Sequence, residues 1–211
     1  MLQRSKPDRL AYWYFRLNGF LTTENFVIHP ETGSNQGTDA DLLGVRFSQR
    51  SEGGRFPLHD DPSIADSGAP VNVIIAEVKT SKCSLNGPWT SPKAGNMRET
   101  LRAIGCVPPA SEEDATRTLF RDGRWSDDTV SVRLFAIGEY RDPDLAISES
   151  QQLIWRDVIS FTMDRFRSYK TRKSAVGQWE ADGQLLQKAS LLMDESRIRE
   201  YFRLQPLKQP G

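Results

Sequence analysis

The chain has 211 residues, of which 37% are hydrophobic, so it is long enough to bury one sizeable core. Its 28 Lys and Arg residues balance 28 Asp and Glu residues, which excludes an overall electrostatic attraction to nucleic acid. The longest apolar run, 71–78, falls well short of the roughly 20 residues that cross a bilayer, and the N-terminus lacks the pattern of a signal peptide. We therefore expect a cytoplasmic protein without a membrane segment.

The first 50 residues predict one helix and two strands. Apolar residues at helical spacing predict a helix over 8–18, with Asp8 as its N-cap and Gly19 just beyond its end. Apolar and β-branched residues predict a strand over 20–28 with an irregularity at Glu24 and Asn25. A second strand is predicted over 38–47.

A long segment and a buried strand follow. Residues 48–70 are rich in Gly, Pro, Ser and Asp, which predicts an exposed insertion. Residues 71–80 form the clearest strand of the sequence, because both alternating faces are apolar until Glu77. This pattern is typical of a central strand that is covered on both sides.

The rest of the chain alternates between helix and strand. We expect a helix over 92–104, an acidic linker, and a strand over 130–140. Beyond Pro143 the apolar spacing is helical again, and two shorter helices are expected over 183–193 and 195–203. The sequence thus predicts an α/β domain at 1–145 with a helical C-terminal extension at 146–211 packed on it.

Two cysteines, Cys83 and Cys106, are too few for a disulfide framework and lack the paired spacing of a zinc site. We interpret them as two ordinary thiols.

Acidic residues mark two of the predicted strands. Asp41 stands near the start of one strand, and Glu77-Val78-Lys79 ends the next. Residues two apart on a strand share a face and lie about 6.6 Å apart, so Glu77 and Lys79 can act on the same water. With Asp41 on the neighbouring strand, the carboxylates would form the oxygen-rich site that Mg²⁺ or Mn²⁺ prefers.

This arrangement resembles the PD-(D/E)XK nuclease superfamily over roughly residues 8 to 140. The resemblance implies a restriction endonuclease-like core of order αβββαβ, with a mixed central sheet flanked by helices. It also implies that Asp41, Glu77 and the Val78 carbonyl bind the metal, and that Lys79 positions or deprotonates the nucleophile. The proline of the family name is missing, because the acid here lies within 37–41, Gly-Thr-Asp-Ala-Asp.

Further acids leave the ligand set open. Asp39 shares a face with Asp41 and is either a second ligand or its replacement; we favour Asp41 because it leads directly into the apolar strand. Members of the superfamily often place a carboxylate on the first helix, which here offers only Asp8 at its start. Glu24 is an additional candidate, and a site with one metal or two remains open. A plain salt bridge between Glu77 and Lys79 is the alternative.

Basic residues near the C-terminal side provide candidates for binding nucleic acid. A run interleaved with aromatic residues either tracks phosphates or forms the solvated face of a helix. Trp89 either contacts substrate or packs under its own loop. The candidate nucleic-acid contacts are Lys82, Arg165, Arg167, Lys170, Arg172 and Lys173.

The function that these patterns predict is a Mg²⁺-dependent endonuclease that hydrolyses phosphodiester bonds of DNA. The alternative is a catalytically inactive nuclease-like module that binds nucleic acid or a protein partner. A third interpretation is an unrelated α/β protein in which the motif is accidental. The sequence does not separate DNA from RNA, and its near-neutral charge predicts that substrate binding depends on a homodimer or a partner subunit.

Overall fold

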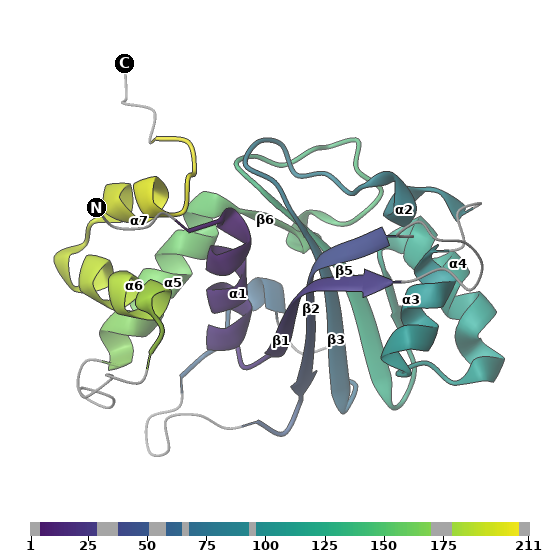
Figure 1. The fold of residues 1–211 in the computed structure, drawn as a ribbon. Helices are drawn as coiled ribbons and strands as arrows, with labels where there is room; N and C mark the ends of the chain where they lie inside the picture. Colours follow the sequence, from purple (N-terminus) through teal and green to yellow (C-terminus); the bar gives the residue numbers. More distant parts are fainter. Residues whose placement is uncertain are drawn as a thin grey trace.

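The computed structural model describes residues 5–28, 38–50, 58–64, 68–92, 96–169 and 179–206. These residues form an α/β fold in which helices flank a mixed, open sheet of six strands (Figure 1). The strands are β1 (Leu21–Ile28), β2 (Thr38–Phe47), β3 (Val71–Val78), β4 (Arg124–Ser126), β5 (Val130–Gly138) and β6 (Gln152–Ile154). The helices are α1 (Pro7–Leu17), α2 (Gly87–Thr90), α3 (Asn96–Ile104), α4 (Glu112–Asp122), α5 (Trp155–Tyr169), α6 (Ala181–Leu192) and α7 (Glu195–Tyr201). Within these ranges, no helix has the length and apolar character to cross a membrane.

The sheet has the strand order β1-β2-β3-β5-β4, with β6 also paired to β5. The first three strands form an antiparallel meander, whereas β3 and β5 run parallel. A parallel pair requires a crossover, and α2, α3 and α4 lie in it. The remaining edge of β5 is shared, because β4 pairs with its first half and β6 with its last three residues. The carboxyl ends of β3 and β5 therefore meet at one end of the sheet.

Two hydrophobic layers cover the sheet, one on each face. Ile74, Ala76 and Val78 of β3 pack in the layer that contains α1, α5, α6 and α7. Val73 and Ile75 pack in the opposite layer, with α3 and α4. Figure 1 shows these two groups of helices on opposite sides of the sheet. The alternation along β3 confirms that this strand is buried on both faces.

The first helix differs slightly from its prediction. It begins at Pro7 with Lys6 as the N-cap, so Asp8 lies in its first turn and is not the cap. Proline suits the first helical position because its missing N–H would be unpaired there in any case. Gly19 follows the helix with φ of +86°, as a chain reversal after a helix requires. Asn25 in β1 has φ of +51°, which confirms the irregularity predicted there.

The acidic linker predicted after α3 is wrong, because helix α4 occupies most of it. Three acids fill its first turn, where they complement the helix dipole, and Gly123 ends it with φ of +66°. Only Ala115 and Leu119 of this helix are buried, one turn apart. A second correction concerns β6, since the residues just before α5 form a strand.

The predicted insertion 48–70 is described in part. Its residues 62–64 form a short 3-10 helix, and Ile64 is buried there. The ranges 51–57 and 65–67 lie outside the described residues.

The segment predicted as a C-terminal extension contributes to both the sheet and the core. Strand β6 belongs to it, and α5, α6 and α7 pack in the same hydrophobic layer as α1. The amide of Ser5 donates to the carbonyl of Tyr201 at 2.9 Å, which joins the two ends of the described chain.

Candidate functional site

The strands β2 and β3 part where the acidic motif begins. Their paired register ends at Leu42 opposite Ala76. Beyond this pair, the Val78 amide donates to Oδ2 of Asp41 at 2.7 Å and not to a carbonyl of β2. The amide and carbonyl of one strand residue leave the same edge, so the Val78 carbonyl also faces the side of Asp41. We call the point where the two strands part, beside the Asp41 carboxylate and the Val78 carbonyl, the opening.

Glu77 is a buried carboxylate with two donors. Its side chain is 1% exposed and shares a face of β3 with Val73 and Ile75. Lys79 Nζ lies 3.0 Å from Oε2, and the indole Nε1 of Trp89 donates to Oε1 at 2.6 Å. The structure therefore brings Glu77 and Lys79 together, as their spacing predicted, and adds a second donor from a different segment.

The surroundings of Glu77 act on its pKa in opposite directions. Burial raises the pKa of this carboxyl above its usual range, and the negative charge of Asp41 raises it further. The hydrogen bonds from Lys79 and Trp89 act in the opposite direction. Desolvation and a neighbouring like charge both disfavour the ionised form, and a bound cation would remove the second effect.

The main chain of Lys79 is fixed on two sides. Its amide donates to the Ile137 carbonyl of β5 at 2.9 Å, and its carbonyl accepts from the indole of Trp155 at 2.9 Å. The side chain is 27% exposed, so the ammonium lies between the buried carboxylate and solvent. From this position the ammonium can contact a group that approaches from solvent.

Two acids outside the motif lie near this opening. Burial raises the pKa of Asp8, and the charges of Asp41 and, to a smaller extent, Glu24 raise it further. Glu24 accepts from Arg9 at 2.7 Å, and Arg9 also binds Asp182 of α6 at 2.8 Å. Glu24 thus shares the single charge of Arg9 with two other acids, whereas Asp8 adds negative charge beside Asp41. The sequence signal for Asp8 was its place on the first helix, which we had assigned to capping.

Asp39 lies further from the motif than Asp41 does. It stands opposite Val27 of β1, beyond the last pair of β2 with β3. Among the described residues, no group of three or more His, Cys, Asp or Glu side chains is arranged to hold a metal ion. The oxygen donors that the structure brings toward one opening are the carboxylates of Asp41 and Glu77 and the Val78 carbonyl. This set suits a cation that keeps several waters, as Mg²⁺ does.

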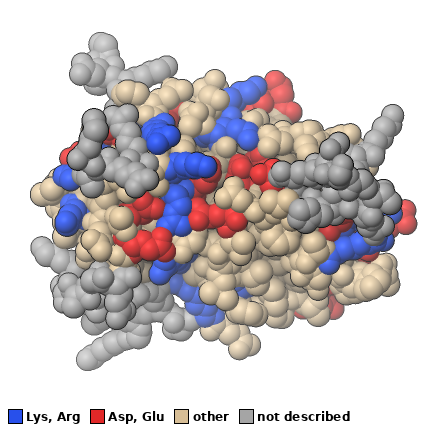
Figure 2. Space-filling model, viewed as in Figure 1, with Lys and Arg blue, Asp and Glu red and all other residues tan. Residues whose placement is uncertain are grey.

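The basic candidates are paired with acids wherever the structure describes them. Lys82 binds Asp142 at 2.8 Å, and Arg167 binds Asp164. Arg165 is buried; its guanidinium lies 3.5 Å from Asp60 and donates to the His59 carbonyl at 2.6 Å, so it is directed into the protein. Lys170, Arg172 and Lys173 lie outside the described residues. Figure 2 shows the same mixture of charge, with Lys and Arg interleaved with Asp and Glu near the centre of one face.

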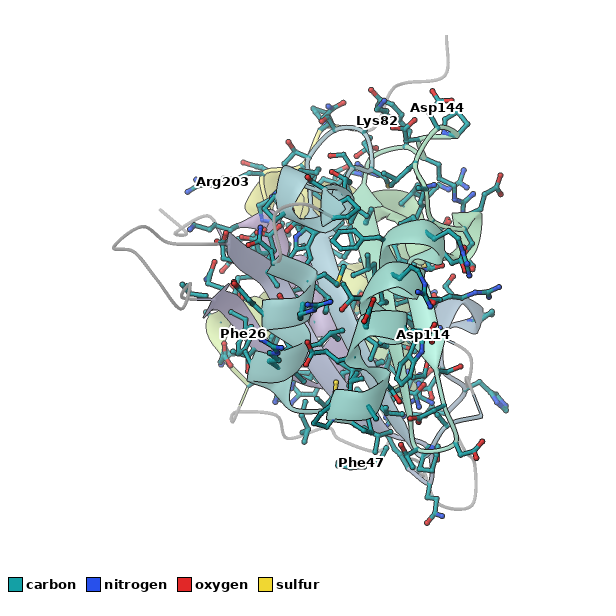
Figure 3. The ribbon with its side chains drawn as sticks, turned by 90° about the vertical axis from the view of Figure 1, so that its right-hand side faces the viewer. Phe26, Phe47, Lys82, Asp114, Asp144 and Arg203 are labelled. Atoms are coloured by element: carbon teal, nitrogen blue, oxygen red, sulfur yellow. The ribbon has the colours of Figure 1, made fainter. Side chains whose placement is uncertain are left out.

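Lys82 marks the end of the molecule where the site lies. Figure 3 shows Lys82 and Asp144 together at one end and Phe47, the last residue of β2, near the other. Lys82 follows β3 and Asp144 follows β5, so this is the end at which the two parallel strands finish. Trp89 does not contribute to the surface here, because its side chain is 1% exposed.

A cavity of about 230 Å³ lies apart from these residues. It is lined by Tyr14 of α1, Asp61, Arg141 and Asp157 of α5, among others. None of the predicted site residues lines it, so it does not compete with the acidic opening as the site of the motif.

The chain was compared with protein-family models, curated proteins and solved structures, and none of them matches.

Proposed function

We propose that this protein is a metal-dependent endonuclease that hydrolyses phosphodiester bonds of DNA. The observation that carries the proposal is the hydrogen bond from the Val78 amide to Asp41, next to Glu77 and where β2 and β3 part, with Lys79 bound to Glu77. Three residues separated by up to 38 positions thus face one opening at the end of a buried strand.

The arrangement of elements supports this proposal. Helix α1 precedes β1, β2 and β3, and the helices of the crossover precede β5. This order and the mixed sheet agree with the αβββαβ core that the resemblance to PD-(D/E)XK nucleases implies. We therefore include a restriction endonuclease-like core in the proposal.

The oxygen donors fit a hard divalent cation. Asp41, Glu77 and the Val78 carbonyl would hold Mg²⁺ or Mn²⁺, and their number leaves room for waters and a substrate phosphate. When bound, the cation supplies a water of lowered pKa and neutralises charge on the phosphate. Asp8 lies near enough to interact with Asp41 and strengthens the negative potential that attracts the cation.

Lys79 acts from the solvent side of Glu77. Its ammonium donates to the buried carboxylate and is itself 27% exposed. A lysine in this position orients the attacking water and stabilises the negative charge that develops on the phosphate. Its fixed main chain keeps this ammonium at the opening.

The surface supports a role for further contacts to DNA. Lys82 and Arg167 are paired with acids, so their charge is partly neutralised before a phosphate arrives. A balanced chain of 28 basic and 28 acidic residues gains little from general attraction to a polyanion. We therefore propose that a second copy of the chain or a partner subunit completes the DNA-binding surface.

Cleavage assays test the proposal directly. Purified protein is incubated with supercoiled, linear and single-stranded DNA and with structured RNA, in Mg²⁺, Mn²⁺ or a chelator. We expect metal-dependent cleavage of DNA that is lost in Glu77→Gln and reduced at least about a hundredfold in Lys79→Ala, as for removal of a group that stabilises the transition state. Glu113→Gln and Lys188→Ala change exposed residues of α4 and α6 and serve as matched controls.

The alternative of an inactive binding module predicts a different result. Salt-dependent DNA binding without cleavage in any metal, and unchanged by Glu77→Gln, would favour it. Cleavage that persists in both motif variants would refute the assigned site.

A further inference from the structure

Trp89 lies outside the motif but donates a hydrogen bond to Glu77. It belongs to α2, eleven residues beyond the end of β3. Its indole Nε1 lies 2.6 Å from Oε1 of Glu77, and both side chains are 1% exposed. A short hydrogen bond from a neutral donor to a buried carboxylate is a strong one.

The position of the indole is set by the core. Trp89 packs in the hydrophobic layer that contains Met97 and Leu101 of α3. Its amide donates to the Asn86 carbonyl at 2.9 Å, and the amide of Cys83 fixes the preceding loop to the Tyr140 carbonyl at 2.9 Å. The indole N–H is thus held by packing and cannot follow the carboxylate if the carboxylate turns.

The second oxygen of Glu77 is held by Lys79 at 3.0 Å. A carboxylate has about four acceptor directions, so the two donors found among the described residues use about two of them and fix the orientation of the carboxylate. Trp89 carries no charge, and it therefore orients the carboxylate without competing electrostatically with a cation.

We propose that Trp89 is a positioning residue that holds the Glu77 carboxylate in the orientation that binds the divalent cation. This inference rests on the proposed function of the site as a metal centre. A tryptophan that only satisfied its own N–H would affect stability alone. A positioning residue also affects the affinity for the metal.

Trp89→Phe tests this distinction, because it keeps an aromatic ring in the core and removes the donor. Affinity for Mn²⁺ is measured by electron paramagnetic resonance of the free ion. We expect affinity about ten- to hundredfold weaker than in the wild type, as for loss of a group that orients a metal-binding side chain. Trp125→Phe is the matched control, since Trp125 packs in the same layer and donates to Asp114 at 3.0 Å. It should leave Mn²⁺ affinity unchanged.

Indole N–H resonances in NMR spectra give a second readout on the folded wild type. The Trp89 resonance is assigned by its loss in Trp89→Phe, or by selective labelling if that variant does not fold. It should shift in Glu77→Gln and on addition of Mg²⁺, while the Trp125 resonance stays in place. If the Trp89 resonance shifts neither in Glu77→Gln nor on addition of Mg²⁺, the inference is overturned.

The outcomes separate the two proposals. If the wild type binds Mn²⁺ and Glu77→Gln does not, but Trp89→Phe binds as the wild type does, the role of Trp89 is refuted and the metal centre stands. If the wild type binds no Mn²⁺ and cleaves no nucleic acid, the proposed function fails and the role of Trp89 fails with it.

Discussion

Asp41 has a structural role and a proposed functional role that two substitutions can separate. Its carboxylate accepts the hydrogen bond of the Val78 amide at 2.7 Å, in place of a backbone carbonyl. Asp41→Ala leaves that amide without its acceptor, which costs about 1–3 kcal/mol, or roughly 2–12 °C in Tm for a chain of this size. Asp41→Asn keeps an acceptor oxygen at the same place and should therefore avoid this loss.

Charge favours the asparagine variant further when no cation is bound. The charge of Asp41 raises the pKa of both Glu77 and Asp8, which means that ionised Asp41 repels both acids. Removing the charge relieves this repulsion, so Asp41→Asn should be at least as stable as the wild type in a chelator. A loss of function with a gain of stability is the usual sign of a site that stores unfavourable charge.

Thermal unfolding followed by circular dichroism measures these effects. At a Mg²⁺ concentration of 100 Kd the wild type should gain about 2.7 kcal/mol, whereas Asp41→Asn should gain little. Asp39→Asn is the control, because Asp39 lies on the same strand beyond the last pair with β3. If Asp41→Asn melts as low as Asp41→Ala in chelator, the hydrogen-bond argument is wrong. If Mg²⁺ stabilises Asp41→Asn as much as the wild type, Asp41 is not a ligand.

Two further predictions concern the loop beside the site and the thiols. A Cβ at Gly138 would lie 2.6 Å from the Cys83 amide nitrogen, so Gly138→Ala should lower the Tm and weaken Mn²⁺ binding. A Cβ at Gly87 would meet open space, so Gly87→Ala should change neither quantity. Equal Tm values for the two variants would contradict the close approach of this loop to β5. Burial raises the pKa of Cys83 and of Cys106 to about 11, so both thiols are protonated at pH 8 and should react slowly with Ellman's reagent, faster as the pH rises toward 11. Cys106 is partly exposed and should react before the fully buried Cys83, and rapid reaction of both at pH 7 would show that burial does not protect them.

The sequence predicted most of the sheet because its strands have strong local signals. The apolar residues of 71–78 alternate into two cores, and the break at Asn25 was visible as a polar interruption. Helix α4 was missed because its first turn is entirely acidic, a composition that an exposed linker also has. Strand β6 was missed because three residues before a helix give no period that distinguishes strand from helix.

In the site, too, contacts between residues close in the sequence were easier to predict than contacts between distant segments. Glu77 and Lys79 are two residues apart on one strand, so their contact follows from strand geometry alone. The approach of Asp41 to Val78 also required the register of two strands, which local spacing does not give; only the resemblance to the PD-(D/E)XK superfamily implied it. The bond from Trp89 depends on how the crossover folds back over the sheet, and no spacing in the sequence encodes it.

The free energy of the short acid–lysine motif depends on whether its strand end is exposed or buried. An acid and a lysine two positions apart occur often, and at an exposed strand end they form a solvated pair of little energetic value. Here Glu77 is 1% exposed, and both its burial and the charge of Asp41 raise the pKa of its carboxyl. Burying a carboxylate costs free energy unless donors or a cation compensate it, and the two donors found among the described residues, Lys79 and Trp89, use about two of its acceptor directions. A bound cation would offset this cost where the two strands part, as the proposed metal centre requires, and the Mn²⁺ affinity of Glu77→Gln tests it.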